Sequence, residues 1–105
     1  MARRAAKVDD SHGEIRNALR AAGITVFDTS TCGRGYPDLH CAYTGGFSAL
    51  VECKTGKRKL RDSQRDFARM WPCPVIVART GEEAVSEFWR LWKAYGMGAL
   101  WRGPR

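Results

Sequence analysis

The chain has 105 residues, a length that accommodates one domain rather than two. Hydrophobic residues make up 44% and charged residues 28%, which excludes a wholly disordered chain, a coiled coil and a collagen-like repeat. No apolar run approaches the roughly 20 residues of a membrane span. Eighteen Lys and Arg against eleven Asp and Glu leave a net charge of +7. This excess favours a polyanionic partner, usually nucleic acid, although solubility alone would also explain it.

The basic N-terminus, residues 1–10, is expected to be a flexible arm. No apolar stretch follows its arginines, so we expect no secretory signal. The four cysteines are separated by 9, 12 and 20 residues, whereas zinc and iron–sulfur sites normally contain closer pairs; they are Cys32, Cys41, Cys53 and Cys73. We therefore expect reduced cysteines in a cytoplasmic protein.

The first half of the chain predicts a helix, a strand and a hairpin. Ser11 and Glu14 have the spacing of a capping box that opens a helix, which Gly23 would end. Residues 24–27 are β-branched and aromatic and predict a strand, and residues 29–37 predict a loop. Strands at 39–43 and 47–54 flank the turn 44–46, which contains two glycines.

The second half predicts two helices around a buried strand. A helix should run from about residue 62 to 71 and stop before Pro72. The apolar run 75–78 predicts a strand buried on both faces. Thr80 and Glu83 form a second capping box, which opens a third helix. Residues 94–105 read as an irregular aromatic tail that packs on the domain or on another subunit.

The order α-β-β-β-α-β-α predicts one α/β domain over residues 11–93. Its mixed sheet should contain a central antiparallel hairpin and be flanked by helices on its faces.

Three side chains in or beside the predicted hairpin are candidates for a metal site: Asp38, Glu52 and Lys54. Glu52 and Lys54 project from one face of their strand, because alternate residues of a strand share a face. A two-residue turn would pair Asp38 with Cys53, whereas a three-residue turn pairs Asp38 with Glu52. We predict the three-residue turn, which brings the two carboxylates together. Such a pair beside a lysine suits Mg²⁺, although the spacing alone fits a solvated ion pair equally well.

A longer set of motifs favours the Mg²⁺ site over the solvated ion pair. It consists of G-Y-P-D-L at 35–39, V-E-C-K-T at 51–55, Leu60 with Gln64 and Phe67, and V-I-V-A-R at 75–79. Together these resemble the virus-type replication-repair nuclease (VRR-NUC) family of the PD-(D/E)XK nuclease superfamily, over roughly residues 11–92. The resemblance implies a restriction-endonuclease-like fold and a DNA endonuclease that uses Mg²⁺, with Mn²⁺ able to replace it. Tyr36 and Cys53 depart from the residues most often found at these positions.

The resemblance also implies roles for individual residues. Asp38 and Glu52 correspond to metal ligands, and the backbone carbonyl of Cys53 to a further one. Lys54 corresponds to the catalytic lysine. Gln64 and Glu14 correspond to supporting active-site residues.

Several of these residues have competing explanations. Gln64 lies on a helical face with Leu60, Phe67 and Trp71, and a glutamine at the edge of such a stripe also reaches solvent. Glu14 is explained by the capping box alone. His40 shares a strand face with Asp38, where it could assist the site, although a lone strand histidine is more often structural. His12 is expected at the surface.

Basic residues near the predicted site are expected to contact DNA phosphates; they are Arg34, Lys57, Arg58, Lys59 and Arg61. The expected function is hydrolysis of phosphodiester bonds in branched DNA, most simply as a homodimeric Holliday-junction resolvase. The alternatives are a monomeric nickase or flap nuclease, a nucleic-acid-binding module without catalysis, and a cysteine-based metal or redox protein.

Overall fold

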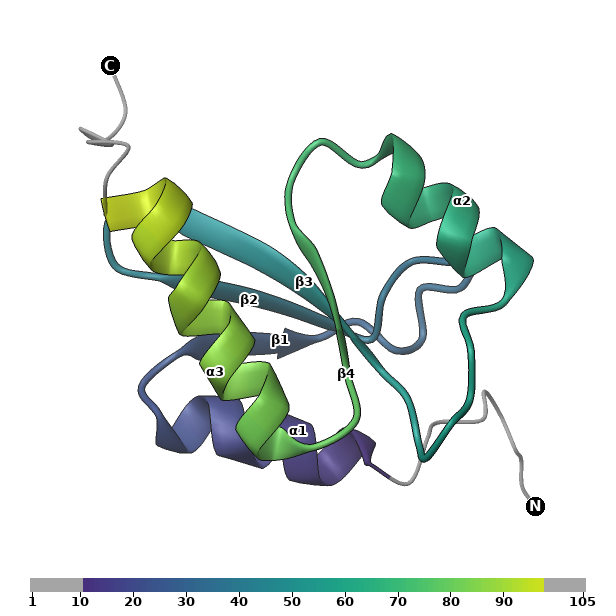
Figure 1. Ribbon diagram of the computed structural model, residues 1–105, viewed down its shortest axis with the longest axis horizontal. Coiled ribbons are helices and arrows are strands. Elements are labelled where there is room, and N and C mark those ends of the chain that lie inside the picture. The colour runs from purple at the N-terminus through teal and green to yellow at the C-terminus, as the bar shows by residue number, and fades with distance from the viewer. Residues whose placement is uncertain (1–10, 98–105) are drawn as a thin grey trace.

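The computed structural model describes residues 11–97, so the predicted arm 1–10 and residues 98–105 of the predicted tail lie outside it. The elements occur in the predicted order (Figure 1). They are α1 (His12–Ala21), β1 (Thr25–Asp28), β2 (Leu39–Tyr43), β3 (Phe47–Cys53), α2 (Asp62–Met70), β4 (Val75–Ala78), α3 (Gly81–Leu91) and the π-helical turn η1 (Trp92–Met97). No helix within residues 11–97 is long and apolar enough to cross a membrane.

The four strands form one mixed sheet in the order β1-β2-β3-β4. The β1–β2 and β2–β3 pairs are antiparallel, and β4 runs parallel to β3. This confirms the α/β class and the central antiparallel hairpin. The parallel pair requires a crossover connection, which α2 and its flanking loops provide.

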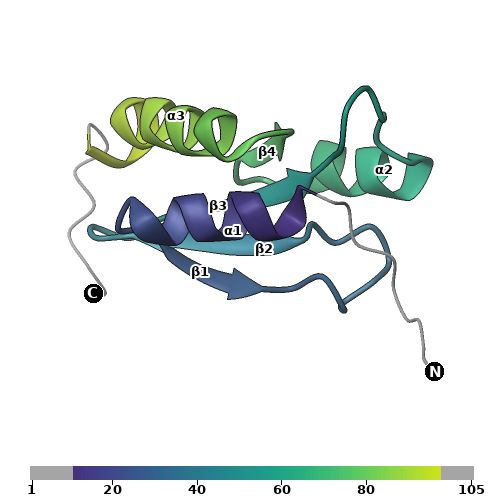
Figure 2. The ribbon, with the colours of Figure 1, turned by 90° about the horizontal axis from the view of Figure 1, so that it is seen from below.

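Within residues 11–97, helices cover one face of the sheet, whereas the sequence predicted helices on its faces. Figure 2 shows α1 and α3 on the same side of the sheet, and α2 beyond the end of the strands. The apolar side chains of α2 instead meet the loop that precedes β2. The Tyr36 ring lies 5.1 Å from the Phe67 ring and 6.2 Å from the Trp71 ring. These ring contacts explain why α2 leaves the sheet face.

The main hydrophobic core fills the space between the sheet and the two helices on that side. Ile15 and Leu19 of α1 and Phe88 of α3 are fully buried, as is Val51 of β3. The opposite sheet face is more open, because Phe27 is 71% exposed there and Val75 and Val77 are only half-buried. The expectation that the strand 75–78 is buried on both faces is therefore wrong.

Two local predictions at α1 are wrong as well. Ser11 does not cap α1: it has helical backbone angles, and its hydroxyl donates to the Lys54 carbonyl at 3.0 Å. His12 is buried rather than exposed, with its Nε2 3.5 Å from Asp28 Oδ2. Ser11 turns inward because α1 begins against the end of β3, and His12 turns toward the end of β1.

At α3 the predicted cap is present in modified form. Thr80 Oγ1 accepts from the Glu83 N–H at 3.0 Å, as predicted. The Glu83 carboxylate, however, accepts from the N–H of Arg79 rather than that of Thr80. At the other end the chain stays helical to Met97, so the predicted irregular tail does not begin at residue 94.

Candidate active site

The β2–β3 hairpin brings the two acidic residues together. Tyr43 pairs with Phe47 across the three-residue turn, and the same register continues to Leu39 opposite Val51. One further position places Asp38 opposite Glu52, and their side chains are hydrogen-bonded to each other. The predicted three-residue turn is thus confirmed, and so is the convergence of the two carboxyl groups.

Asp38 is oriented by the backbone on both sides. Its Oδ2 accepts from the Cys53 N–H at 2.9 Å, and its carbonyl accepts from the Thr29 N–H at 2.8 Å. The Thr29 hydroxyl donates to the carbonyl of Pro37 at 2.9 Å, which fixes the residue before Asp38. The half-buried Asp38 carboxyl group therefore has a defined direction at the mouth of β2.

Glu52 lies inside the site, where it is only 3% exposed. Its Oε2 is 3.9 Å from Lys54 Nζ, and Lys54 is itself 4% exposed. The same oxygen accepts from Gln64 Nε2 at 2.6 Å. The other end of the Gln64 amide accepts from the Arg61 N–H at 2.8 Å, which caps α2. Since both ends of the amide are engaged, the first turn of α2 holds the Glu52 carboxyl group in one orientation.

This environment raises the pKa of Glu52 to about 8. Burial is the main cause, and the neighbouring Asp38 carboxylate adds to it. Lys54 and Arg61 act in the opposite direction and only partly offset the rise. At neutral pH the Glu52 carboxyl group of the metal-free protein is therefore mainly protonated.

The donor set fits Mg²⁺ or Mn²⁺. No group of three or more His, Cys, Asp or Glu side chains within residues 11–97 is arranged to hold a metal ion. Mg²⁺ needs only one or two protein carboxylates, because it keeps several waters and takes further oxygens from phosphates. A divalent cation bound here would favour the ionised form of both carboxyl groups and so would displace the proton that burial keeps on Glu52.

Cys53 can contribute only through its backbone, because its side chain lies in the hydrophobic core. This agrees with the prediction that its side chain faces away from the carboxylates. Its N–H is already used to orient Asp38.

Glu14 has a structural partner. Its Oε2 accepts from the Gly81 N–H at 2.9 Å, which ties the first turn of α1 to the start of α3. The negative charge at this helix N-terminus is electrostatically favourable. This contact accounts for Glu14 without a catalytic role.

His40 is exposed on the sheet face that also carries Glu52, and its Nε2 lies 2.9 Å from the Ser48 hydroxyl.

The predicted DNA-contacting residues all lie at the surface, mainly in the segment 57–61 that joins β3 to α2; they are Arg34, Lys57, Arg58, Lys59 and Arg61. Sequence analysis missed the residue that holds this segment. The Arg79 guanidinium donates to the Gly56 and Arg58 carbonyls, each at 2.7 Å. No local pattern signals this role, because the contacts join residues more than twenty positions apart.

The cysteines do not form a site. Cys41 and Cys53 are buried, whereas Cys32 and Cys73 are exposed, and all four are free thiols. Burial raises the pKa of the Cys41 thiol to about 12, which makes it inert.

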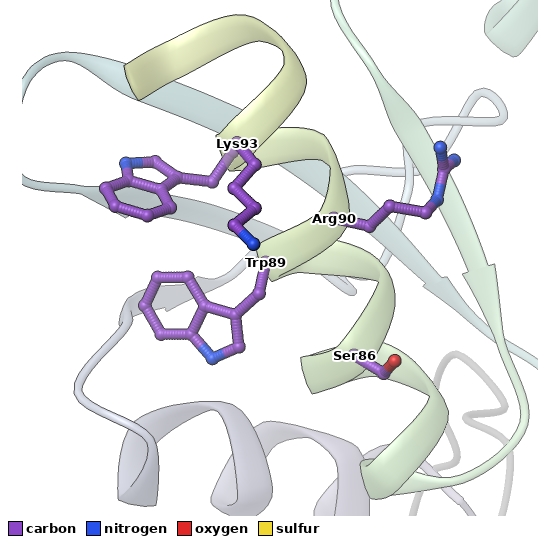
Figure 3. A pocket seen from close by; sticks show the side chains of 5 residues that line it. Ser86, Trp89, Arg90 and Lys93 are labelled. Carbon is purple, nitrogen blue, oxygen red and sulfur yellow. The ribbon is translucent and has the colours of Figure 1, made fainter. Parts of the chain in front are cut away.

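A cavity of about 360 Å³ on α3 is also separate from the carboxylates; its lining residues are Ser86, Trp89, Arg90, Trp92 and Lys93. Figure 3 shows that Trp89 and Lys93 project to one side of the helix and Arg90 to the other. Since α3 and its π-helical extension supply every lining residue, this is a shallow surface feature.

No family model, curated protein or solved structure matches this chain. Its function is therefore inferred from the geometry and chemistry of the site.

Proposed function

We propose that this chain is a metal-dependent DNA endonuclease of the PD-(D/E)XK type, similar to the VRR-NUC family. It would hydrolyse phosphodiester bonds in branched DNA, most simply as a Holliday-junction resolvase. One observation carries the proposal: the half-buried Asp38 carboxyl group meets the buried Glu52 carboxyl group beside the buried Lys54 at the end of the hairpin.

Each residue of the site has a distinct role in this proposal. Asp38 and Glu52 hold Mg²⁺, which would polarise the phosphodiester and lower the pKa of a bound water. Lys54 is the cation beside them and stabilises the charge that develops on the phosphate. Gln64 keeps the Glu52 carboxyl group directed at the site through its hydrogen bond of 2.6 Å.

The surface around the site suits a polyanion. The segment 57–61 joins the strand that carries Glu52 to the helix that carries Gln64, so its cations lie near the cleaved phosphate. Resolving a four-way junction requires two symmetric cuts, and a two-fold dimer supplies two sites. We therefore propose a homodimer, and light scattering of the protein with and without junction DNA tests it.

The decisive experiment measures cleavage of labelled four-way junctions, flaps, single strands and linear duplexes with Mg²⁺ or Mn²⁺. Asp38→Ala and Lys54→Ala test the site. Their matched controls are Asp62→Ala and Lys93→Ala, which remove exposed residues of the same charge elsewhere. Circular dichroism of every variant separates loss of catalysis from loss of folding.

The outcomes distinguish the alternatives. Symmetric paired cuts in the junction, absent in both site variants and present in both controls, support the resolvase. Cuts restricted to flaps or single strands would agree with the proposed active site and would favour the monomeric nuclease over the resolvase. Tight DNA binding without cleavage of any substrate contradicts the catalytic proposal and favours the binding module.

A further inference from the structure

A second cavity, of about 240 Å³, lies between the loop that precedes β2 and helix α2; it is lined by Arg34, Ser63, Asp66, Phe67 and Met70. Two segments form it, and each continues into the site. The loop that contains Arg34 leads directly to Asp38, and Ser63 precedes Gln64 on α2. A group bound in the cavity therefore contacts the two segments that also carry Asp38 and Gln64.

The backbone of the loop is specialised for close approach to α2. Gly33, Arg34 and Gly35 all have positive φ angles, of 75°, 61° and 82°. A Cβ atom on Gly35 would lie 2.3 Å from the Ser63 carbonyl oxygen, so only glycine allows the loop to contact the helix backbone. Arg34 is a non-glycine residue held in this left-handed conformation, and such outliers cluster at binding sites.

The lining combines an aromatic ring, an exposed thioether chain and two opposite charges. Phe67 is half-buried and stacks on Trp71, with ring centroids 5.0 Å apart. Met70 is 73% exposed, although it is a large apolar residue. Arg34 supplies a cation, and Asp66 supplies a carboxylate that is also 3.6 Å from Arg69. This set offers an apolar surface, a phosphate partner and a hydrogen-bond acceptor.

We propose that this cavity binds one unpaired nucleobase of the DNA strand, with Arg34 on its phosphate; this rests on the proposed function. The volume is below the roughly 300–1,000 Å³ of pockets for drug-sized ligands and suits a single base. Phe67 and Met70 pack against the base, and the Asp66 carboxylate accepts from an exocyclic amino group. Adenine, cytosine and guanine have such a group, and thymine does not.

The proposal would also account for the preference for branched DNA that is part of the proposed function. A base within a duplex must be unstacked and unpaired before it can enter a cavity, which is unfavourable by a few kcal/mol. Bases at a branch point are already partly unstacked. The cavity therefore selects substrates by the presence of an unpaired base beside the cleaved bond.

The test is direct binding, measured by fluorescence anisotropy in EDTA so that no cleavage occurs. The probes are labelled single strands of oligo-dC, oligo-dT and an abasic oligomer, and a duplex of the same length. Wild-type protein should bind oligo-dC at least about fivefold more tightly than the abasic strand, as expected for one stacked base. It should also bind oligo-dC more tightly than oligo-dT and the duplex.

Asp66→Asn should reduce the preference for oligo-dC over oligo-dT about fivefold or more. Its control is Asp62→Asn, an exposed Asp on the same helix that also pairs with the Arg three residues later. Glycine adopts the left-handed backbone readily, so Arg34→Gly should keep the loop conformation. The variant should weaken binding to all single strands alike and reduce the slope of log affinity against log salt concentration by about one, as expected for the loss of one phosphate contact. Arg65→Ala, which removes a cation outside the cavity, is its control.

Equal affinity of the wild-type protein for oligo-dC and the abasic strand would overturn the proposal. Equal effects of Asp66→Asn and Asp62→Asn on the preference for oligo-dC over oligo-dT would do the same. Because these measurements need no metal, they can succeed when cleavage fails, and cleavage can succeed when they fail.

Discussion

The Glu52→Gln variant replaces the buried carboxyl group with an amide. In the metal-free protein, its free energy of unfolding relative to wild type should rise from acid to alkaline pH. The pKa of Glu52 rises from 4.5 to about 8 in the folded protein, mainly because of burial. Between these values the native protein holds a proton that the unfolded chain has released. The free energy of unfolding therefore falls as the pH rises, and the loss levels off above the native pKa.

The magnitude follows from the size of the pKa difference. At about 1.4 kcal/mol per pH unit, ionising Glu52 in the native site costs the wild-type protein on the order of 5 kcal/mol at most. Glu52→Gln keeps an acceptor for Gln64 Nε2 but carries no ionisable group. From about pH 5 to about pH 9, we expect the variant to gain about 2–5 kcal/mol relative to wild type.

Urea denaturation followed by circular dichroism in EDTA measures this difference at each pH. Glu82→Gln, which removes an exposed carboxylate from the first turn of α3, is the control, and its difference from wild type should barely change with pH. If the Glu52→Gln and wild-type stability curves run parallel from about pH 5 to about pH 9, the raised pKa of Glu52 is wrong.

Addition of Mg²⁺ extends the same test to the proposed metal site. Binding should ionise Glu52, so at neutral pH it should release up to one proton per site. Calorimetry in two buffers of different ionisation enthalpy detects this proton. Glu52→Gln should abolish both the release and the stabilisation by Mg²⁺, whereas unchanged Mg²⁺ stabilisation in the variant would place the ion elsewhere.

Three further substitutions test how the site is assembled. Gly35→Ala should lower the free energy of unfolding by more than about 2 kcal/mol, because its Cβ would clash with the α2 backbone; Gly33→Ala, with open space around it, should lose only about 1 kcal/mol, and equal losses would argue against the clash. Glu14→Ala should lower thermal stability by about 1 kcal/mol without changing Mg²⁺ affinity in a calorimetric titration, and a large loss of affinity would instead support the metal-site role. Gln64→Ala should cost about 1–3 kcal/mol in urea denaturation, because it breaks the hydrogen bond to Glu52, and it should slow DNA cleavage further; a stable, fully active variant would refute this positioning role.

The sequence by itself determined the element order and the meeting of Asp38 with Glu52. Both are local properties: helical and strand periodicities lie within short windows, and a three-residue turn sets the register of adjacent strands. The position of Gln64 on its helix was also readable, since helical spacing defines the face it occupies. The resemblance implied only a supporting role for Gln64, and the structure showed that its amide donates to Glu52.

Only the tertiary structure decided which groups separated in sequence become partners. The Ser11 hydroxyl reaches the Lys54 carbonyl, the Glu14 carboxylate reaches the start of α3, and Arg79 holds the basic segment. Each contact joins residues at least twenty-one positions apart, where no periodicity or turn preference operates. The predicted capping box at Ser11 shows most clearly where local sequence patterns fail. The Ser11 hydroxyl does not cap its helix, because folding brings the Lys54 carbonyl within hydrogen-bond distance.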